Sequence, residues 1–187
     1  MRMDEQELVI QIQKGDEMAF AKIVGIYKNK IVNYLYQLTG DYQKAVELSQ
    51  ETFMRVFFKA HKYKPIAPFS SWIYAIASNL AKTEIKRTQR ALMLSLDDVN
   101  NSYRINAFIE NPSSDSGLSR NIRQALNSLH SRYKIPVILK DMEGFSLEEI
   151  AEVLDKPVGT IKARVSRGRN YLKKELEKAL SKSENSP

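Results

Sequence analysis

The sequence contains no cysteine, which excludes disulfide bonds, thiolate nucleophiles, iron–sulfur clusters and cysteine-based zinc sites. Its two histidines, His61 and His130, lie far apart and lack the spacing of metal ligands, so we expect no metal and no other cofactor. No apolar run approaches the roughly 18 residues that a membrane span requires. The charged start of the chain also lacks the apolar core of a signal peptide. These absences predict a cytoplasmic protein with no direct membrane insertion.

Catalytic groups are equally scarce. The adjacent acids Asp97 and Asp98 have no cation nearby and lie in a polar stretch of the chain, where water will solvate them. We therefore expect neither enzymatic activity nor a small-molecule substrate.

Positive charge, by contrast, is in excess. The 187 residues carry 29 Lys and Arg against 22 Asp and Glu, a formal net charge of +7 that favours a polyanionic partner. Hydrophobic residues make up 43% and charged residues 27%, which is typical of a globular rather than a disordered chain. The length allows one ordinary domain or two small ones.

The segment 146–174 contains two helical patterns separated by a sharp stop. Ser146 and Glu149 have the spacing of a capping box at the start of the first helix. Pro157 ends that helix, because the residue before a proline is pushed out of the α region. A second apolar stripe starts at once and runs along residues 158–172. Two helices joined by so short a turn predict a helix-turn-helix, whose second helix can lie in the major groove of DNA.

The second of these helices has a polar face with basic edges. Residues 156–174 include seven Lys or Arg and no acid. At about 100° per residue, small and polar side chains lie opposite the apolar stripe, and Lys162 and Arg164 flank them. A polar centre suits base edges, and basic edges suit phosphates. The alternative is a solvated basic face on an ordinary helical hairpin, but the capping box, the tight turn and the polar centre together favour DNA binding.

Nearly every other segment also has helical periodicity, so we expect an all-α fold without strands. Gly15 and Gly40 stop the first two helices. A third helix runs over about residues 42–61. Pro65 and Pro68 then predict a loop, after which a long helix leads into the basic run at residues 86–90.

Residues 91–117 differ from the rest of the chain because Asn, Asp, Ser, Pro and Gly dominate them. This composition predicts a flexible linker, with at most a short helix near residues 104–109. We therefore expect two small helical domains, an N-terminal bundle over residues 1–90 and a C-terminal helix-turn-helix domain over residues 118–187.

One helix of the N-terminal domain carries an unusual polar face. In the segment AVELSQETF, residues 45–53, Leu48 faces the core while Glu47, Gln50 and Glu51 stay on exposed faces. An acidic, amide-bearing surface on a basic protein can dock a protein partner. The alternative is that this is an ordinary solvated helix face. Taken alone, these residues favour the solvated face over a docking site.

The loop at residues 62–69 and the helix after it combine aromatic rings with cations. Single-stranded nucleic acid needs this combination, since bases stack on rings and cations neutralise phosphates. Asn79 adds a group that can hydrogen-bond to an exposed base. Trp72 by itself is more simply a core residue, so the nucleic-acid interpretation depends on the whole cluster. The rings belong to Tyr63, Phe69, Trp72 and Tyr74, and the cations to Lys59, Lys62, Lys64, Lys82, Lys86 and Arg87.

Three ordered motifs resemble those of the bacterial extracytoplasmic-function (ECF) σ factors of the σ70 family. They are DYQKAVELSQETF at residues 41–53, FSSWIYAIASN at residues 69–79, and LEEIA followed by VGTIKAR at residues 147–151 and 158–164. The resemblance extends over about residues 19–176, and the order and separation of the motifs make it specific.

The resemblance implies a promoter-specificity factor that binds core RNA polymerase and promoter DNA and performs no chemistry itself. The first domain would hold the polymerase through Glu47, Leu48, Gln50 and Glu51. It would capture the −10 element as melted strand through Lys62, Tyr63, Lys64, Trp72, Asn79, Lys82 and Lys86. The second domain would read the −35 element as duplex through Thr160, Lys162, Arg164, Ser166, Arg167 and Arg169. Family members are commonly restrained by an anti-σ protein, so we expect such a partner too.

The sequence departs from the family pattern at Val46. The family usually has two consecutive acids after the alanine of the first motif, whereas this chain has Val46 followed by Glu47. One polar contact with polymerase would be missing there, or an apolar one would replace it. The main alternative function is a free-standing helix-turn-helix repressor or activator, but such regulators generally bind as dimers and the chain has no obvious dimerisation heptad.

Overall fold

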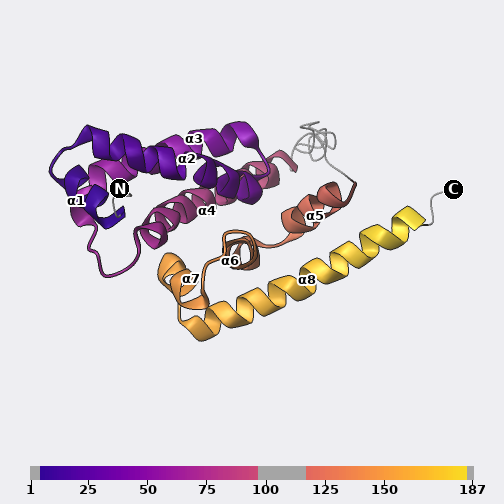
Figure 1. Cartoon of the computed structure of the whole chain (residues 1–187). Coiled ribbons are helices and arrows are strands. Elements are labelled where there is room, and N and C mark those ends of the chain that lie inside the picture. The colour runs from indigo at the N-terminus through magenta and orange to yellow at the C-terminus, as the bar shows by residue number, and fades with distance from the viewer. Residues whose placement is uncertain (1–4, 97–116, 185–187) are drawn as a thin grey trace.

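The computed structural model describes residues 5–96 and 117–184, and within these residues it contains helices and no strand. This confirms the expected all-α fold. Figure 1 shows the helices in chain order. They are α1 (Glu5–Gln13), α2 (Glu17–Thr39), α3 (Tyr42–Lys59), the short 3-10 turn η1 (Ala60–Lys62), α4 (Phe69–Leu96), α5 (Gly117–Ser128), α6 (Ser131–Asp141), α7 (Leu147–Leu154) and α8 (Val158–Glu184).

The helix boundaries of the N-terminal half follow the caps that the sequence predicts. The Asp16 side chain accepts hydrogen bonds from the amides of Met18 and Ala19 at the start of α2. Gly40 ends the same helix in the left-handed region at a φ of 74°, and Asp41 caps α3 through the Lys44 amide. These helices, α1 to α4 with η1, form the N-terminal layer of the molecule (Figure 1).

Helix α4 is longer than the sequence suggested. It begins at Phe69 and continues to Leu96, beyond the basic run that ends at Arg90, so the predicted linker starts as helix. Residues 91–96, ALMLSL, are mostly strong helix formers, so the helix continues until the polar stretch that starts at Asp97. Residues 97–116 of the predicted linker, and the short helix expected near residues 104–109, lie outside the described residues.

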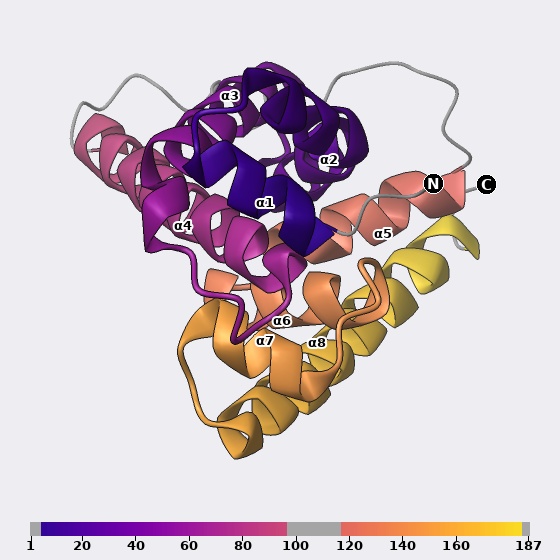
Figure 2. The ribbon, with the colours of Figure 1, turned by 60° about the vertical axis from the view of Figure 1, so that its left-hand side comes forward.

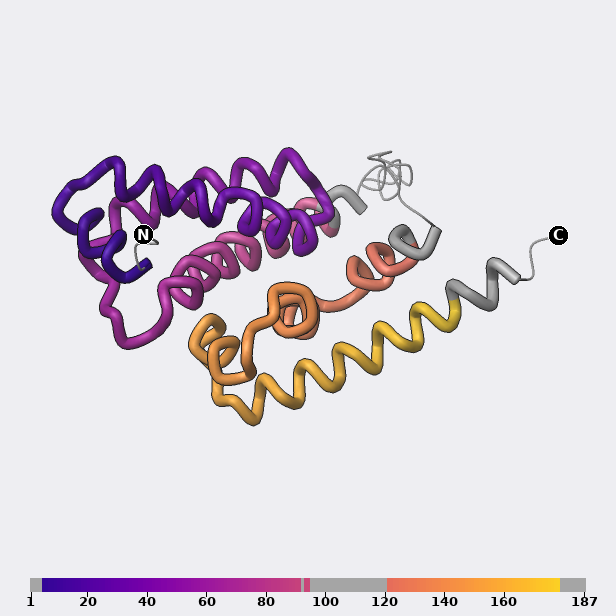
Figure 3. Tube along the Cα trace, viewed as in Figure 1, coloured from indigo at the N-terminus to yellow at the C-terminus, as the bar shows by residue number. Residues whose placement is uncertain are grey.

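The C-terminal half forms a second layer from α5 to α8. The tube in Figure 3 shows α8 running past α7, α6 and α5 in turn, and α8 packs against all three. Pro136 lies in the second turn of α6, where it packs among buried neighbours. The absent proline amide removes one helical hydrogen bond there, but burial of nearly the whole helix offsets the loss.

The two layers pack directly on each other along a seam where α4 contacts α6 and α7, and α2 contacts α5 and α6 (Figure 2). The Lys134 amine of α6 is buried in this seam, 2.9 Å from the Leu38 carbonyl oxygen of α2 and 2.8 Å from Asn127 Oδ1. Tyr74 of α4 donates to the Glu143 carboxylate, and its ring lies 4.8 Å from that of Phe145. Buried residues of both layers therefore form one continuous core.

Candidate nucleic-acid interface

The turn between α7 and α8 has the geometry of a helix-turn-helix. The Glu149 amide donates to Ser146 Oγ at 3.1 Å, and the Ser146 amide donates to Glu149 Oε2 at 2.8 Å, which completes the predicted capping box. Asp155 then adopts a left-handed conformation with a φ of 50° and ends α7 two residues before Pro157. A short polar residue tolerates this conformation better than most, so the stop depends on Asp155 as well as on the proline.

The outer face of α8 is available to solvent. Lys162, Ser166 and Arg167 are exposed and Thr160 is half-buried, whereas Ile161 and Val165 of the apolar stripe are buried. The two remaining arginines of the predicted −35 set, Arg164 and Arg169, lie on opposite edges of this outer face. Arg169 pairs with Asp141 of α6, with Arg169 Nε 3.0 Å from Asp141 Oδ2, and this bond fixes one edge of the face.

Gly168 brings α8 close to α6, a feature that the sequence reasoning missed. A Cβ at this position would lie 2.5 Å from Val137 Cγ2 and 3.3 Å from the Tyr133 carbonyl oxygen. Gly168 continues the stripe of Ile161 and Val165 at helical spacing, and this periodicity was the signal that could have identified it. This close approach at Gly168 determines the distance between α8, which carries the basic face, and α6.

The −10 residues divide into exposed and buried groups. Lys62 at the end of η1 and Lys64 in the loop before α4 are exposed, and Trp72 is half-buried. Tyr63 is buried instead of projecting as a platform, and its hydroxyl donates to the Ala67 carbonyl at 2.8 Å. Its ring lies 5.7 Å from Phe69 and 5.3 Å from Trp72. Tyr63 therefore shapes the loop from within.

The helical part of the −10 set lies along one face of α4. Asn79 and Lys86 are exposed, while Lys82 is half-buried with its amine 3.3 Å from Asn79 Oδ1. Lys82 and Lys86 line a cavity of about 240 Å³ together with Arg164 of α8. The structure thus brings two predicted −10 residues and one predicted −35 residue together at one place, here called the basic cavity.

The predicted polymerase-binding residues lie on α3, where Glu47 and Gln50 are exposed and Leu48 is half-buried. Glu51 accepts a hydrogen bond from Arg55 Nε at 2.8 Å, so this acid is already paired within the helix.

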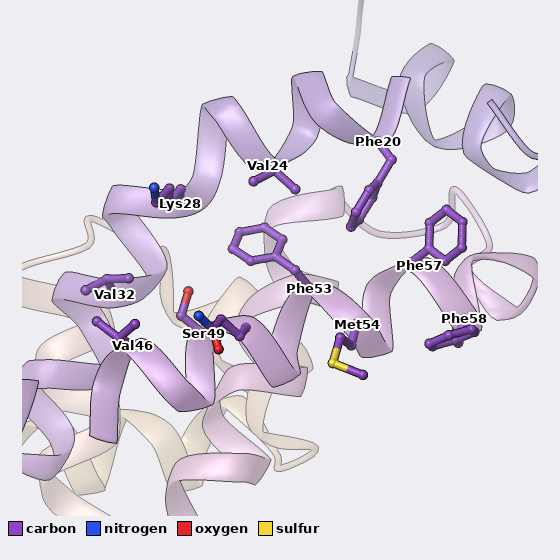
Figure 4. Close-up of a pocket in the computed structure, with 11 residues that line it drawn as sticks. Phe20, Val24, Lys28, Val32, Val46, Ser49, Phe53, Met54, Phe57 and Phe58 are labelled. Atoms are coloured by element: carbon purple, nitrogen blue, oxygen red, sulfur yellow. The ribbon is translucent and has the colours of Figure 1, made fainter. Parts of the chain in front are cut away.

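Beside these residues, α2 and α3 enclose an apolar groove of about 520 Å³ (Figure 4). Figure 4 shows Phe20 and Val24 of α2 facing Phe53 of α3 across this groove, and the rings of Phe20 and Phe57 are 5.0 Å apart. Val46 lines the groove, so the residue that departs from the family pattern belongs to an apolar surface.

Met54 and Phe58 extend the groove to the surface, and the sequence reasoning missed both. Their exposed fractions are 54% and 68%, which is high for large apolar side chains. Apolar residues that lie off the buried stripe of a helix were the signal in the sequence. An exposed apolar patch of this kind marks an interaction surface.

Other kinds of site find no support in the described parts of the chain. None of their helices is long and apolar enough to cross a membrane. No group of three acidic or histidine side chains there could hold a metal ion. The helix-turn-helix, its solvent-facing polar surface and the basic residues around it define a helical DNA-binding protein.

Comparisons with known proteins identify the kind of DNA-binding protein. Residues 23–91 match the family Sigma-70 region 2, and residues 119–172 match Sigma-70, region 4. The chain is 33% identical to the ECF RNA polymerase sigma factor SigW of Bacillus subtilis over 184 residues, covering 94% of this chain and 98% of SigW. It is 30% identical to the ECF RNA polymerase sigma-E factor of Haemophilus influenzae, covering 94% of this chain and 97% of the relative. The chain belongs to the ECF σ factors of the σ70 family.

Solved structures have the same fold. CnrH, in complex with the cytosolic domain of CnrY, superimposes with a TM-score of 0.69 at 21% identity, covering 92% of this chain and 97% of CnrH. The sigma factor RpoE of Bartonella quintana, in complex with the anti-sigma factor NepR, superimposes with a TM-score of 0.66 at 25% identity, covering 84% and 96%. As an ECF σ factor, the protein directs promoter recognition by RNA polymerase and is an initiation factor, not an enzyme.

Proposed function

We propose that the outer face of α8 reads the −35 element as duplex DNA, with Thr160, Ser166 and Arg167 closest to the bases. The observation that supports this most is the exposure of the polar centre of α8 beside a buried apolar stripe. Lys162, Arg164 and Arg169 lie at the edges of this face, where a helix in the major groove approaches the phosphates.

The −10 element is read by the N-terminal layer in this proposal. Lys62 and Lys64 of the loop, with Asn79, Lys82 and Lys86 of α4, supply the phosphate and base contacts, and half-buried Trp72 offers a ring edge. Tyr63 has a supporting role, because its buried ring and its bond to Ala67 hold the loop in shape.

The polymerase binds the outer side of α3 through Glu47, Leu48, Gln50 and Glu51, with the apolar groove beside them. The groove supports this assignment because it joins a polar rim to an apolar centre, the usual anatomy of a protein interface. Binding to polymerase places the protein in the cytoplasm. Like RpoE with NepR, it would also have an anti-σ partner.

The closed arrangement must open for this function. The −10 and −35 elements are centred about 25 base pairs apart, or about 85 Å of duplex at 3.4 Å per base pair. Lys82 and Arg164 line the same small cavity and cannot reach both elements at once. We infer that the two layers separate on the polymerase before the promoter is engaged.

The first experiment is run-off transcription with core RNA polymerase, with and without this protein, on a pool of promoters from its own genome. The expected result is a set of protein-dependent transcripts whose templates share one −35 and one −10 sequence. An absence of transcripts, with salt-sensitive binding of the protein alone to duplex DNA, would favour the free-standing repressor or activator.

A further inference from the structure

The basic cavity is lined by five cations that come from both layers of the molecule. Two lie on α4 and three on or beside α6 and α8: Lys82, Lys86, Arg132, Lys156 and Arg164. Within residues 5–96 and 117–184, no acidic side chain lines this cavity. The seam therefore gathers positive charge without neutralising it.

The electrostatics of Lys82 reflect this crowding. Burial lowers the pKa of its amine, and the nearby charges of Lys156, Arg164 and Lys86 lower it further. Among the described residues, Lys82 Nζ has a hydrogen-bond partner in Asn79 Oδ1 at 3.3 Å, and the Arg132 guanidinium lies over the Tyr133 ring at 4.7 Å. None of the five cations forms an ion pair within the described chain. Closing the seam thus brings like charges together, which disfavours the closed arrangement unless an anion enters.

The size and lining of the cavity restrict what can enter. Its volume of about 240 Å³ is below the roughly 300–1,000 Å³ of typical ligand pockets, so a small group fits and a DNA duplex does not. Ile135, Pro136 and Leu154 supply apolar walls, and Ser131 contributes a hydroxyl. Ser131 and Arg132 are the first two residues of α6, so the positive end of the helix dipole adds to the side-chain charges.

We propose that the basic cavity binds a small multivalent oxyanion, namely a di- or triphosphate group, which holds the two layers together. Phosphate oxygens accept several charge-assisted hydrogen bonds at once, and arginine and lysine are their usual partners. Opening the seam separates the α4 cations from those of the C-terminal layer, so the complete site exists only in the closed chain. A ligand of this kind stabilises the closed state by mass action.

The consequence for transcription rests on the proposed function. Lys82, Lys86 and Arg164 are residues assigned to the promoter, and a bound anion withdraws all three from it. The anion would therefore compete with promoter DNA although it contacts the outer face of α8 only at its Arg164 edge.

The test combines calorimetry with a distance measurement on the full chain. Because the sequence has no cysteine, Asn29→Cys and Lys174→Cys give one exposed dye site in each layer. Sodium triphosphate is titrated at about 150 mM salt, where long-range attraction is largely screened. We expect one triphosphate per chain and higher energy transfer at saturation. Arg132→Gln with Lys156→Gln should weaken binding about tenfold, and the matched pair Lys14→Gln with Lys22→Gln, on exposed sites that do not line the cavity, should leave it unchanged.

Each other outcome has a defined meaning. Equal weakening by both double variants, or binding without a change in energy transfer, would overturn the proposal. An acidic hexapeptide that binds where triphosphate does not would assign the cavity to a protein segment instead.

A further titration uses a nucleoside triphosphate in place of sodium triphosphate. Equal affinity means that the phosphate group alone is recognised, and tighter binding means that the nucleoside adds contacts. Both results support the site. Run-off transcription without added anion tests the proposed function separately, so it can stand if the anion does not bind.

Discussion

The outer faces of α3 and α8 are both open to solvent, but they present opposite chemistry. Beside α3, the exposed apolar side chains of Met54 and Phe58 border a groove with a polar rim. On the outer face of α8, the side chains of Lys162, Ser166 and Arg167 are exposed, and the apolar residues Ile161 and Val165 are turned inward. The groove beside α3 is therefore suited to a partner that buries apolar surface, whereas the outer face of α8 is suited to a hydrated polyanion.

This difference indicates how binding to polymerase and binding to promoter DNA can be distinguished in solution. Contacts to DNA phosphates weaken steeply with salt because binding releases counterions. Burial of apolar surface depends much less on ionic strength. Polymerase binding through α3 and promoter binding through α8 should therefore respond differently to the same change of buffer, and single substitutions should affect one and spare the other.

The largest effect is expected from charging the groove. Met54→Asp with Phe58→Asp should weaken binding to core polymerase by about 3 kcal/mol, more than a hundredfold, because two exposed apolar anchors are lost. Ile10→Asp, on a similarly exposed apolar residue of α1, serves as the control. Fluorescence anisotropy with labelled protein measures the affinity. Equal losses from the double variant and from Ile10→Asp would remove the groove from the interface.

The next effect concerns sequence reading by α8. Arg167→Ala should reduce discrimination at one −35 position by roughly 1–3 kcal/mol, because a contact to a base edge is lost. Competition binding with single-base variants of the −35 element measures this, and polymerase affinity should not change. Uniform weakening on every sequence would move Arg167 to the phosphate-contacting group.

A smaller effect is expected from the close approach of α8 to α6. Gly168→Ala places a Cβ against Val137, and overpacking costs about 1–3 kcal/mol while the better helix propensity of alanine returns about 1. The net loss of unfolding free energy should be about 1 kcal/mol by urea denaturation. Gly159→Ala is the control, since a Cβ there meets nothing within 4 Å. If the two variants are equally stable, α6 and α8 are not tightly packed.

The smallest effect tests whether the two layers behave as one body. Burial lowers the pKa of Lys134 to about 8, whereas an unfolded lysine titrates near 10.4. Between these values the unfolded chain holds a proton that the folded chain has released, so the unfolding free energy rises with pH. We expect a gain of about 1 kcal/mol between pH 7.5 and pH 9. Lys134→Met should lack this gain, and a gain of the same size in the variant would mean that other groups cause it.

Local signals in the sequence were enough to predict much of the fold and part of the site. The Ser146 capping box, the stops at Gly15 and Gly40, and the apolar stripe of α8 each depend on residues within a few positions of one another. The helix boundaries confirm the capping box and the stops, and the burial of Ile161 and Val165 confirms the stripe except at Val158, which is 39% exposed. The polar centre of α8 was predicted in the same way, because helical periodicity alone decides which residues share a face.

What the sequence did not reveal depends on contacts between distant segments. The seam, the basic cavity and the groove each combine helices far apart in the chain, and a periodicity describes only one helix at a time. The burial of Tyr63 belongs to the same class, since its ring packs with those of Phe69 and Trp72 around the loop. Gly168 is intermediate, because its place in the stripe was visible but the nearness of Val137 was not.

The bonds across the seam join residues that are very distant in sequence. Tyr74 and Glu143 are 69 positions apart, and Lys134 reaches across 96 positions to Leu38. Each of the two layers is otherwise held by contacts between neighbouring helices. Contacts that close long loops form late in folding, and a boundary held by a few of them can part while the helices stay intact. The seam is therefore the boundary at which we expect the two layers to separate most easily, with the helices of each layer intact.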